Sequence, residues 1–556
     1  MVQRKHGTTF VVFGFIIYKG AVNMKMKKII AGMTAFLLVC GAVPVAEFTG
    51  INFGHSLSAS AAEAAVVESG VTSAGFVYDI HGTKEWDEEI EDYVTLTRDF
   101  VAITGYDGSE GAIEIPKTIA DLPVTQIGEQ AFKDNSVISS VKINENITAI
   151  GERAFNNCDN LSKINVPESV THIAWWTFQG CPKLTSLTIP DSVLSIADGA
   201  FWGDSSLTSI KLPKNLKTIG NNLFSDCSRL TSVNIPENVT SIGSGAFSGC
   251  SSLTDITIPS KVTSIGDSAF CDCESLVSVD FPKSVLSIGD AAFEDCIHLT
   301  EANLPNGLQT IGNDAFRNCS SLTEFSFPDT VTSISDSTLE SCKSLISVEI
   351  PNSIKSIGAG AFQSCTALPE INIPDSVKAI GNDVFCECDS LKEITIPSSI
   401  TSIPYGAFYS CSSLKRVNIP DTVVSIGDLS FNNCENLREI TIPASVKKIG
   451  SHSLGYEWSV NRGDEDFTIY GHKGTAAETY ASENDCIFVD LDAPQPIIGD
   501  INSDSKADIA DAVLLQKYLL AAEKLTTEQY EAADLNGDDS IDVFDMVSMR
   551  KLITKK

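Results

Sequence analysis

The chain has 556 residues and a formal net charge of −33, because 72 acidic residues outnumber 39 basic ones. This excess of acid argues against binding to nucleic acid or to an anionic membrane surface, since both need clustered Lys and Arg. Hydrophobic residues make up 43% of the chain, which is too large a share for a disordered protein.

The N-terminal part of the chain has the features of an export signal. A basic stretch at 24–28 precedes an apolar run of 17 residues at 29–45. Small residues at 59–61 are of the kind that signal peptidase accepts. We therefore predict that residues 1–61 are an upstream segment and a signal peptide, that the mature protein is secreted and extracellular, and that no stable membrane insertion follows cleavage. A retained N-terminal anchor is the alternative.

A 23-residue repeat fills the middle of the chain, where prolines recur at every 23rd position from 167 to 443. In the unit that begins at Leu253, the spacing L-x-x-L-x-L predicts a short strand that Pro259 ends, since proline cannot donate to a sheet. Gly266 is expected at a turn. One such rung buries too few side chains to fold alone, so about fifteen rungs must stack into a solenoid.

The recurring motif I-P-x-x-V-x-x-I-G-x-x-A-F-x-x-C resembles the BspA-like class of leucine-rich repeats. The resemblance covers about residues 95–490. Residues 467–491 resemble the closing cap of that family, and residues 62–94 are expected to form an N-terminal cap. The resemblance to this class implies an α/β-type solenoid, a secreted or cell-surface location and a surface that binds protein or polysaccharide. It also implies that no catalytic site is shared by the family.

Twelve of the 16 cysteines share one position of the repeat, from Cys158 to Cys434, and Asp204 occupies the one missing step. Disulfides are common in secreted proteins that are rich in cysteine. This periodicity instead favours a ladder of buried free thiols that act as small apolar side chains. A zinc site is not expected, because the chain has no C-x-x-C motif.

The strand positions that we expect on the concave side are polar, and those of the C-terminal half are acidic. Trp175, Trp176 and Trp202 interrupt the repeat at turn positions of neighbouring rungs and form a candidate ligand patch. Local packing is the alternative explanation. We predict no catalytic residues, because the chain has no nucleophile elbow, no H-E-x-x-H and no phosphate-binding loop.

Two acidic loops of twelve residues, each leading into a predicted helix, follow a proline-containing linker at 491–498. Oxygen-bearing side chains occupy positions 1, 3, 5, 9 and 12 of both loops, and position 7 would offer a backbone carbonyl. This is the donor set that Ca²⁺ requires. The predicted ligands of two Ca²⁺ ions are Asp500, Asn502, Asp504, Lys506, Asp508 and Asp511 in the first loop and Asp534, Asn536, Asp538, Ser540, Asp542 and Asp545 in the second.

Residues 499–556 resemble a type I dockerin, because both loops end in Asp and no helix precedes the first loop. The resemblance implies a small all-α calcium-binding domain with a duplicated loop and helix, which plugs into a cohesin domain of a cellulosome scaffoldin. In this family, loop positions 10 and 11 and the following helix select the cohesin. The corresponding residues here are Ile509, Ala510, Gln516, Lys517, Val543, Phe544, Arg550 and Lys551.

Three loop positions depart from the dockerin pattern. Ser505 and Asp539 replace the glycine of position 6, and Ala507 replaces the usual bulkier aliphatic residue at position 8. We therefore expect weaker Ca²⁺ binding in the first loop. Because the two halves differ in sequence, we expect one preferred orientation on the cohesin, with the largest contributions from Phe544 and Arg550.

These patterns together predict a secreted, non-catalytic cellulosome subunit. Its dockerin would bind a scaffoldin cohesin in a Ca²⁺-dependent way, while its leucine-rich repeat array presents a surface to protein or polysaccharide. One alternative is a polysaccharide-degrading component of the cellulosome, an O-glycosyl hydrolase, although the repeat leaves no room for a separate catalytic domain. A second alternative is a surface adhesin or a protein inhibitor.

Overall fold

The computed structural model describes residues 65–87, 92–95, 97–457, 462–463, 466–493 and 497–554. The predicted signal peptide lies outside these residues. Within the described ranges, none of the helices has the length and apolar character needed to cross a membrane.

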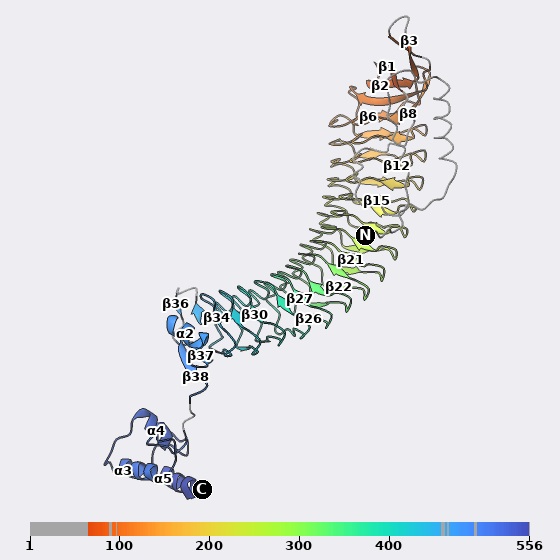
Figure 1. Cartoon of the computed structure of the whole chain (residues 1–556). Coiled ribbons are helices and arrows are strands. Elements are labelled where there is room, and N and C mark those ends of the chain that lie inside the picture. Colours follow the sequence, from red (N-terminus) through yellow and green to blue (C-terminus); the bar gives the residue numbers. More distant parts are fainter. Residues whose placement is uncertain are drawn as a thin grey trace, which may run out of the picture. The chain divides into compact units, whose positions relative to one another are not determined.

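The first described residues form one sheet with the strand order β1-β2-β5-β8-β10 (Figure 1). Pairing is antiparallel from β1 to β5 and parallel from β5 onward, so a hairpin leads directly into the stacked coil. The strands of this region are β1 (Ala65–Val71), β2 (Phe76–Gly82), β3 (Lys84–Asp87), β4 (Asp92–Thr95), β5 (Phe100–Tyr106), β7 (Thr118–Ile119) and β8 (Leu122–Ile127).

Two ladders of short parallel strands run through the rungs. The first ladder contains the strand predicted from L-x-x-L-x-L, for example at Asp255–Thr257. Its strands are β6 (Ala112–Glu114), β9 (Ser140–Lys142), β11 (Lys163–Ile164), β13 (Ser186–Thr188), β15 (Ser209–Lys211), β18 (Asp255–Thr257), β20 (Ser278–Asp280), β22 (Glu301–Asn303), β24 (Glu324–Ser326), β26 (Ser347–Glu349), β29 (Glu393–Thr395), β31 (Arg416–Asn418) and β33 (Glu439–Thr441).

The second ladder was not predicted. It consists of two-residue strands, which precede the recurring glycine in most rungs. Its strands are β10 (Ala149–Ile150), β12 (His172–Ile173), β14 (Ser195–Ile196), β16 (Thr218–Ile219), β17 (Ser241–Ile242), β19 (Ser264–Ile265), β21 (Ser287–Ile288), β23 (Thr310–Ile311), β25 (Ser333–Ile334), β27 (Ser356–Ile357), β28 (Ala379–Ile380), β30 (Ser402–Ile403), β32 (Ser425–Ile426) and β34 (Lys448–Ile449).

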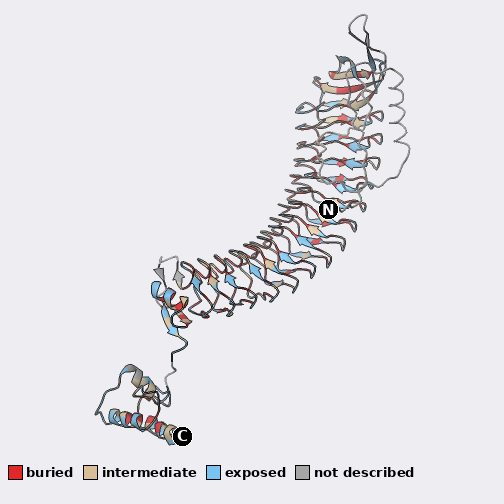
Figure 2. Ribbon diagram, in the orientation of Figure 1, coloured by how far each residue is buried: buried red, intermediate tan, exposed pale blue. Residues whose placement is uncertain are grey.

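The predicted repeat solenoid is confirmed. Isoleucine recurs at every 23rd position from Ile127 to Ile449, which marks fifteen successive rungs, and the strands before and after them extend the coil to about 17 turns. The rest of each rung consists of turns rather than helix, so the solenoid is almost entirely β and irregular structure. In most first-ladder strands the central residue is buried and its neighbours are exposed, as Figure 2 shows.

Two ladders of identical side chains, one of phenylalanine and one of cysteine, run through the core. Phenylalanine rings stack along the coil with centroids 5.0–5.7 Å apart, and Leu339 takes the place of one ring. Beside them, each cysteine of the repeat donates its thiol proton to a backbone carbonyl 26 residues earlier, as Cys273 does to Phe247 at 3.3 Å. The twelve cysteines that share this position are free and buried, so the predicted ladder of buried thiols is confirmed.

Burial makes these thiols unreactive. It raises the pKa of Cys342 to about 12, and a protonated thiol is a poor nucleophile and metal ligand. The cysteine ladder therefore serves packing.

The recurring glycine has a different role from the predicted one. Gly266 follows β19, but its backbone is not in the left-handed region. A Cβ atom there would lie 2.5 Å from the backbone nitrogen of Ser244 in the preceding rung. Glycine is thus needed because two rungs approach closely, rather than because the chain turns.

The missing step of the cysteine ladder holds a buried carboxyl group. Asp204 is fully buried, and one of its oxygens accepts a hydrogen bond from the backbone N–H of Cys181 at 2.8 Å. Its second oxygen has no hydrogen-bond partner. Burial raises the pKa of the Asp204 carboxyl well above its ordinary value of 3.8, because the charged form is poorly solvated there.

We predict that Asp204→Cys stabilises the protein, by about 1–3 kcal/mol near neutral pH, because it removes an unsatisfied buried polar atom. The folded carboxyl keeps its proton at pH values where the unfolded chain has released it. The native state therefore loses stability as the pH rises above the ordinary carboxyl pKa. Thermal unfolding of both proteins should show a larger difference at pH 8 than at pH 4.5. An equal difference at both values would contradict this account.

The solenoid ends in a cap formed by β37 (Thr468–Gly471), β38 (Ile487–Asp490) and α2 (Ala476–Glu483). Both strands extend the first ladder in parallel from β33. The hydroxyl of Tyr480 accepts from the N–H of Leu454 at 3.0 Å and donates to its carbonyl at 3.1 Å. Two antiparallel strands of two residues each, β35 (Tyr456–Glu457) and β36 (Arg462–Gly463), precede the cap.

The C-terminal module, residues 497–554, contains α3 (Ile509–Leu519), α4 (Thr527–Ala533) and α5 (Val543–Thr554). Its small core consists of Ile501, Leu515, Ala533 and Met549. α3 and α5 are the two predicted helices. α4 was not predicted, and it begins with a capping box in which Thr526 and Gln529 bond reciprocally.

Candidate functional site

The first acidic loop is closed by carboxylates that accept hydrogen bonds from its own backbone. Asp511 is completely buried, and its two oxygens accept from the N–H groups of Asn502 and Asp508, each at 2.9 Å. Asp500 accepts from Asp504 at 3.0 Å and from Ser505 at 2.7 Å. The acidic side chains therefore point into the loop.

The second loop repeats this arrangement almost bond for bond. Asp545 is also completely buried and accepts from the N–H groups of Leu535 at 2.8 Å and Asp542 at 2.8 Å. Asp534 accepts from Asp539 at 2.9 Å. A hydrogen bond from the hydroxyl of Ser540 is the main reason that the pKa of Asp538 is lowered.

The donor set of each loop fits a hard cation. Carboxylate and amide side chains occupy positions 1, 3, 5 and 12, and Lys506 and Ser540 supply the backbone of position 7. Among the described residues, however, no group of three or more His, Cys, Asp or Glu side chains is arranged so that it could hold a metal ion. In the loops, the carboxylate oxygens instead accept backbone N–H groups.

Position 6 of both loops has the strained conformation that favours glycine. Ser505 has a φ angle of +67° and Asp539 one of +58°, in the left-handed region where a side chain costs energy. Ala507, at position 8 of the first loop, is buried. The expectation of weaker Ca²⁺ binding in the first loop stays a prediction.

The chain matches two family models. BspA type leucine-rich repeat regions match residues 125–254, 240–368 and 332–460, which together cover more than half of the chain. The chain belongs to the BspA-type leucine-rich repeat family. A type I dockerin domain matches residues 498–554, so the C-terminal module is a dockerin. Domains of this type bind calcium and a cohesin partner, and leucine-rich repeat arrays bind proteins; both are non-catalytic module types.

Solved structures with similar chains are bacterial leucine-rich repeat proteins. A leucine-rich repeat protein from Bacteroides ovatus is 27% identical, with a TM-score of 0.49, over 66% of this chain and 97% of that one. A leucine-rich cell surface protein from Faecalibacterium prausnitzii is 28% identical, with a TM-score of 0.45, over 69% of this chain and 94% of that one. Among the curated proteins, none matches the chain.

The predicted cohesin-binding residues lie at the exposed starts and outer faces of the two dockerin helices. Ile509 is 71% exposed at the start of α3, and Phe544 is 64% exposed at the start of α5. Val513 and Val547, one helical turn further on, are exposed as well, and sequence reasoning missed them. Their spacing of four residues from the predicted positions was the available signal. All eight residues of the predicted set are exposed, namely Ile509, Ala510, Gln516, Lys517, Val543, Phe544, Arg550 and Lys551.

The three tryptophans of the candidate ligand patch have local partners. The guanidinium of Arg153 lies 4.5 Å from the ring centroid of Trp176, whose centroid is 6.4 Å from that of Trp175. The indole N–H of Trp202 donates to Asp226 at 2.8 Å. These contacts favour the explanation by local packing, and a ligand role for the patch stays a prediction.

Proposed function

We propose that the mature protein is secreted and is a non-catalytic cellulosome subunit, which its dockerin attaches to a scaffoldin cohesin in a Ca²⁺-dependent way. The observation that carries this proposal is a dockerin match at 498–554 on a chain that is otherwise mostly repeat solenoid. The proposed parts are an N-terminal cap at 62–94, a solenoid with its cap at 95–490, a linker at 491–498 and the dockerin at 499–556.

Two Ca²⁺ ions would occupy the dockerin, one in each loop. The ligands would be the twelve residues at positions 1, 3, 5, 7, 9 and 12. Each loop has four aspartates at the proposed ligand positions, and a bound cation would offset their mutual repulsion and stabilise the fold of this small domain.

The cohesin would contact the exposed apolar starts of α3 and α5 together with the basic side chains toward the C-terminal ends of the same helices. Repeat one offers Ile509 and Ala510, and repeat two offers Val543 and Phe544. The large aromatic ring is present in one half only, which favours a single orientation with Phe544 and Arg550 as the main contributors. The solenoid would present its polar strand face to a protein or polysaccharide ligand.

The test is the binding of the full chain to immobilised type I cohesins. We expect binding in millimolar Ca²⁺, loss of binding in excess chelator and recovery when Ca²⁺ is restored. Binding that persists in excess chelator would contradict the proposal.

A further inference from the structure

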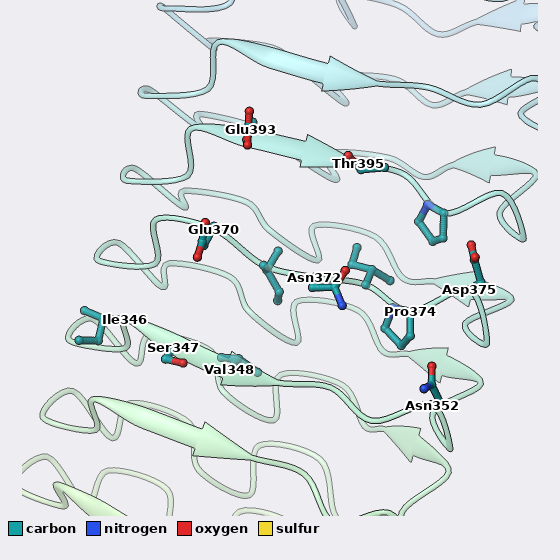
Figure 3. A pocket seen from close by; sticks show the side chains of 13 residues that line it. Ile346, Ser347, Val348, Asn352, Glu370, Asn372, Pro374, Asp375, Glu393 and Thr395 are labelled. Carbon is teal, nitrogen blue, oxygen red and sulfur yellow. The ribbon is translucent and has the colours of Figure 1, made fainter.

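The first ladder is interrupted at several rungs, and hollows lie on the strand face at two of these interruptions. Hydrogen bonding stops between β22 and β24, and again after β26, where residues 370–372 form no strand. The hollow at the first interruption has a volume of about 1000 Å³ and the other about 710 Å³. Ser347 lines both, so they form one continuous groove on the strand face. Figure 3 shows the second hollow.

The second interruption has a cause in the sequence. In most rungs the residue before the strand donates its N–H to the preceding rung, as Thr300 does to Val277 and Ile346 does to Thr323, each at 2.9 Å. Pro369 occupies this position in the next rung and has no N–H to donate to Ile346. Ile346, which lines the second hollow, is 53% exposed, so the groove has an apolar part.

Packing is looser at three rungs of the groove, whereas Phe325, the central residue of β24, is buried. The central residues of β22 and β26, Ala302 and Val348, are only half-buried, and so is Ile371. Their counterparts Ile256 and Ile394 are buried. The apolar part of the groove can therefore accept the aliphatic part of a further side chain.

The rim of the groove is acidic. Glu301, Glu324, Glu370 and Glu393 are exposed at the same strand position, and Figure 3 shows Glu370 and Glu393 on successive rungs at one end of the second hollow. Of the four, only Glu393 forms an ion pair within the described residues, with Arg416 at 3.5 Å. Successive rungs are about 4.8 Å apart, so the carboxylates repel one another and a positive ligand would relieve that repulsion.

The structure favours one kind of occupant. A single metal ion is disfavoured, because no cluster of metal-binding side chains lies among the described residues. A sugar ring would need an exposed aromatic platform, and the two rings that line the groove, Phe325 and Phe327, are buried. Glu301 and Glu393 are four rungs apart, about 19 Å, which six residues of extended chain would span.

We propose that this groove binds an extended polypeptide segment rich in Lys or Arg. The aliphatic stems of its basic side chains would cover the apolar part of the groove, and their charged ends would reach the glutamates. This deepens the proposed function and rests on its claim that the solenoid presents a ligand surface.

The test measures the affinity of the full chain for a fluorescent eight-residue peptide of alternating Lys and Ser. One variant carries Glu301→Gln, Glu324→Gln, Glu370→Gln and Glu393→Gln. A control variant with the same change in net charge carries Glu168→Gln, Glu237→Gln, Glu274→Gln and Glu435→Gln, at exposed sites that do not line the groove.

We expect the groove variant to bind the peptide at least tenfold more weakly, and the control within twofold of the parent protein. Equal losses in both variants would mean that the peptide responds only to net charge, and this would overturn the proposal. So would unchanged binding in the groove variant, or displacement of the peptide by a neutral cello-oligosaccharide. Cohesin binding of the same proteins is a separate readout, since it depends on the dockerin and reports on the proposed function alone.

Discussion

Replacing Asp511 or Asp545 by alanine is expected to abolish Ca²⁺ binding in the corresponding loop and to weaken cohesin binding about a hundredfold. Each aspartate is completely buried and accepts backbone N–H groups from both ends of its loop. Alanine would leave at least two buried donors unpaired, at about 1–3 kcal/mol each. About 2.8 kcal/mol corresponds to a factor of a hundred in affinity.

The control is Glu531→Gln, because Glu531 is exposed on α4 and outside both loops. Its cohesin affinity and Ca²⁺ stoichiometry should equal those of the parent protein, as calorimetric titration measures them. The account would be wrong if Asp511→Ala and Asp545→Ala both kept two Ca²⁺ ions and full cohesin affinity.

Removing one ring from the phenylalanine ladder is expected to cause the largest loss of stability in the solenoid. Phe270 is fully buried and stacks between Phe247 and Phe293, with centroids 5.2 Å away on each side. Phe270→Ala should cost about 3–5 kcal/mol, because the cavity cannot close without breaking the register of two rungs. In a repeat protein this loss falls on the interfaces of one rung. Denaturant unfolding should therefore shift to a lower midpoint or split into two transitions.

Phe270→Leu is the matched control, since the chain itself uses the fully buried Leu339 at the same position of another rung. We expect leucine to cost less than half as much as alanine at this site. Equal losses for both substitutions would mean that the stacked rings are not what holds adjacent rungs together.

The repeat made most of the solenoid predictable. A fixed period of 23 residues places the recurring proline, phenylalanine and cysteine each on a line along the coil, so one correctly predicted rung gives the positions of the others. The thiol ladder followed from the same argument, because twelve cysteines in one phase occupy one recurring core position of the rung. The loop ligands were predictable because Ca²⁺ imposes a spacing on the sequence.

The features that sequence reasoning missed depend on contacts between rungs. The second ladder consists of two-residue strands such as Ser264–Ile265, which are too short to give an alternating pattern. Gly266 looked like a turn residue, and only the position of Ser244 in the preceding rung shows why a side chain is excluded. Pro369 was visible as a proline directly before the strand position of its rung, but its consequence for the strand face depends on the missing bond to Ile346.

The most direct test of the account is a calorimetric titration of the metal-free full chain with Ca²⁺, followed by far-ultraviolet circular dichroism. We predict that two ions bind and that helical signal increases as α3 and α5 become ordered around the loops. Absence of binding heat together with an unchanged spectrum would contradict the claim that this dockerin uses calcium to attach the solenoid to its partner.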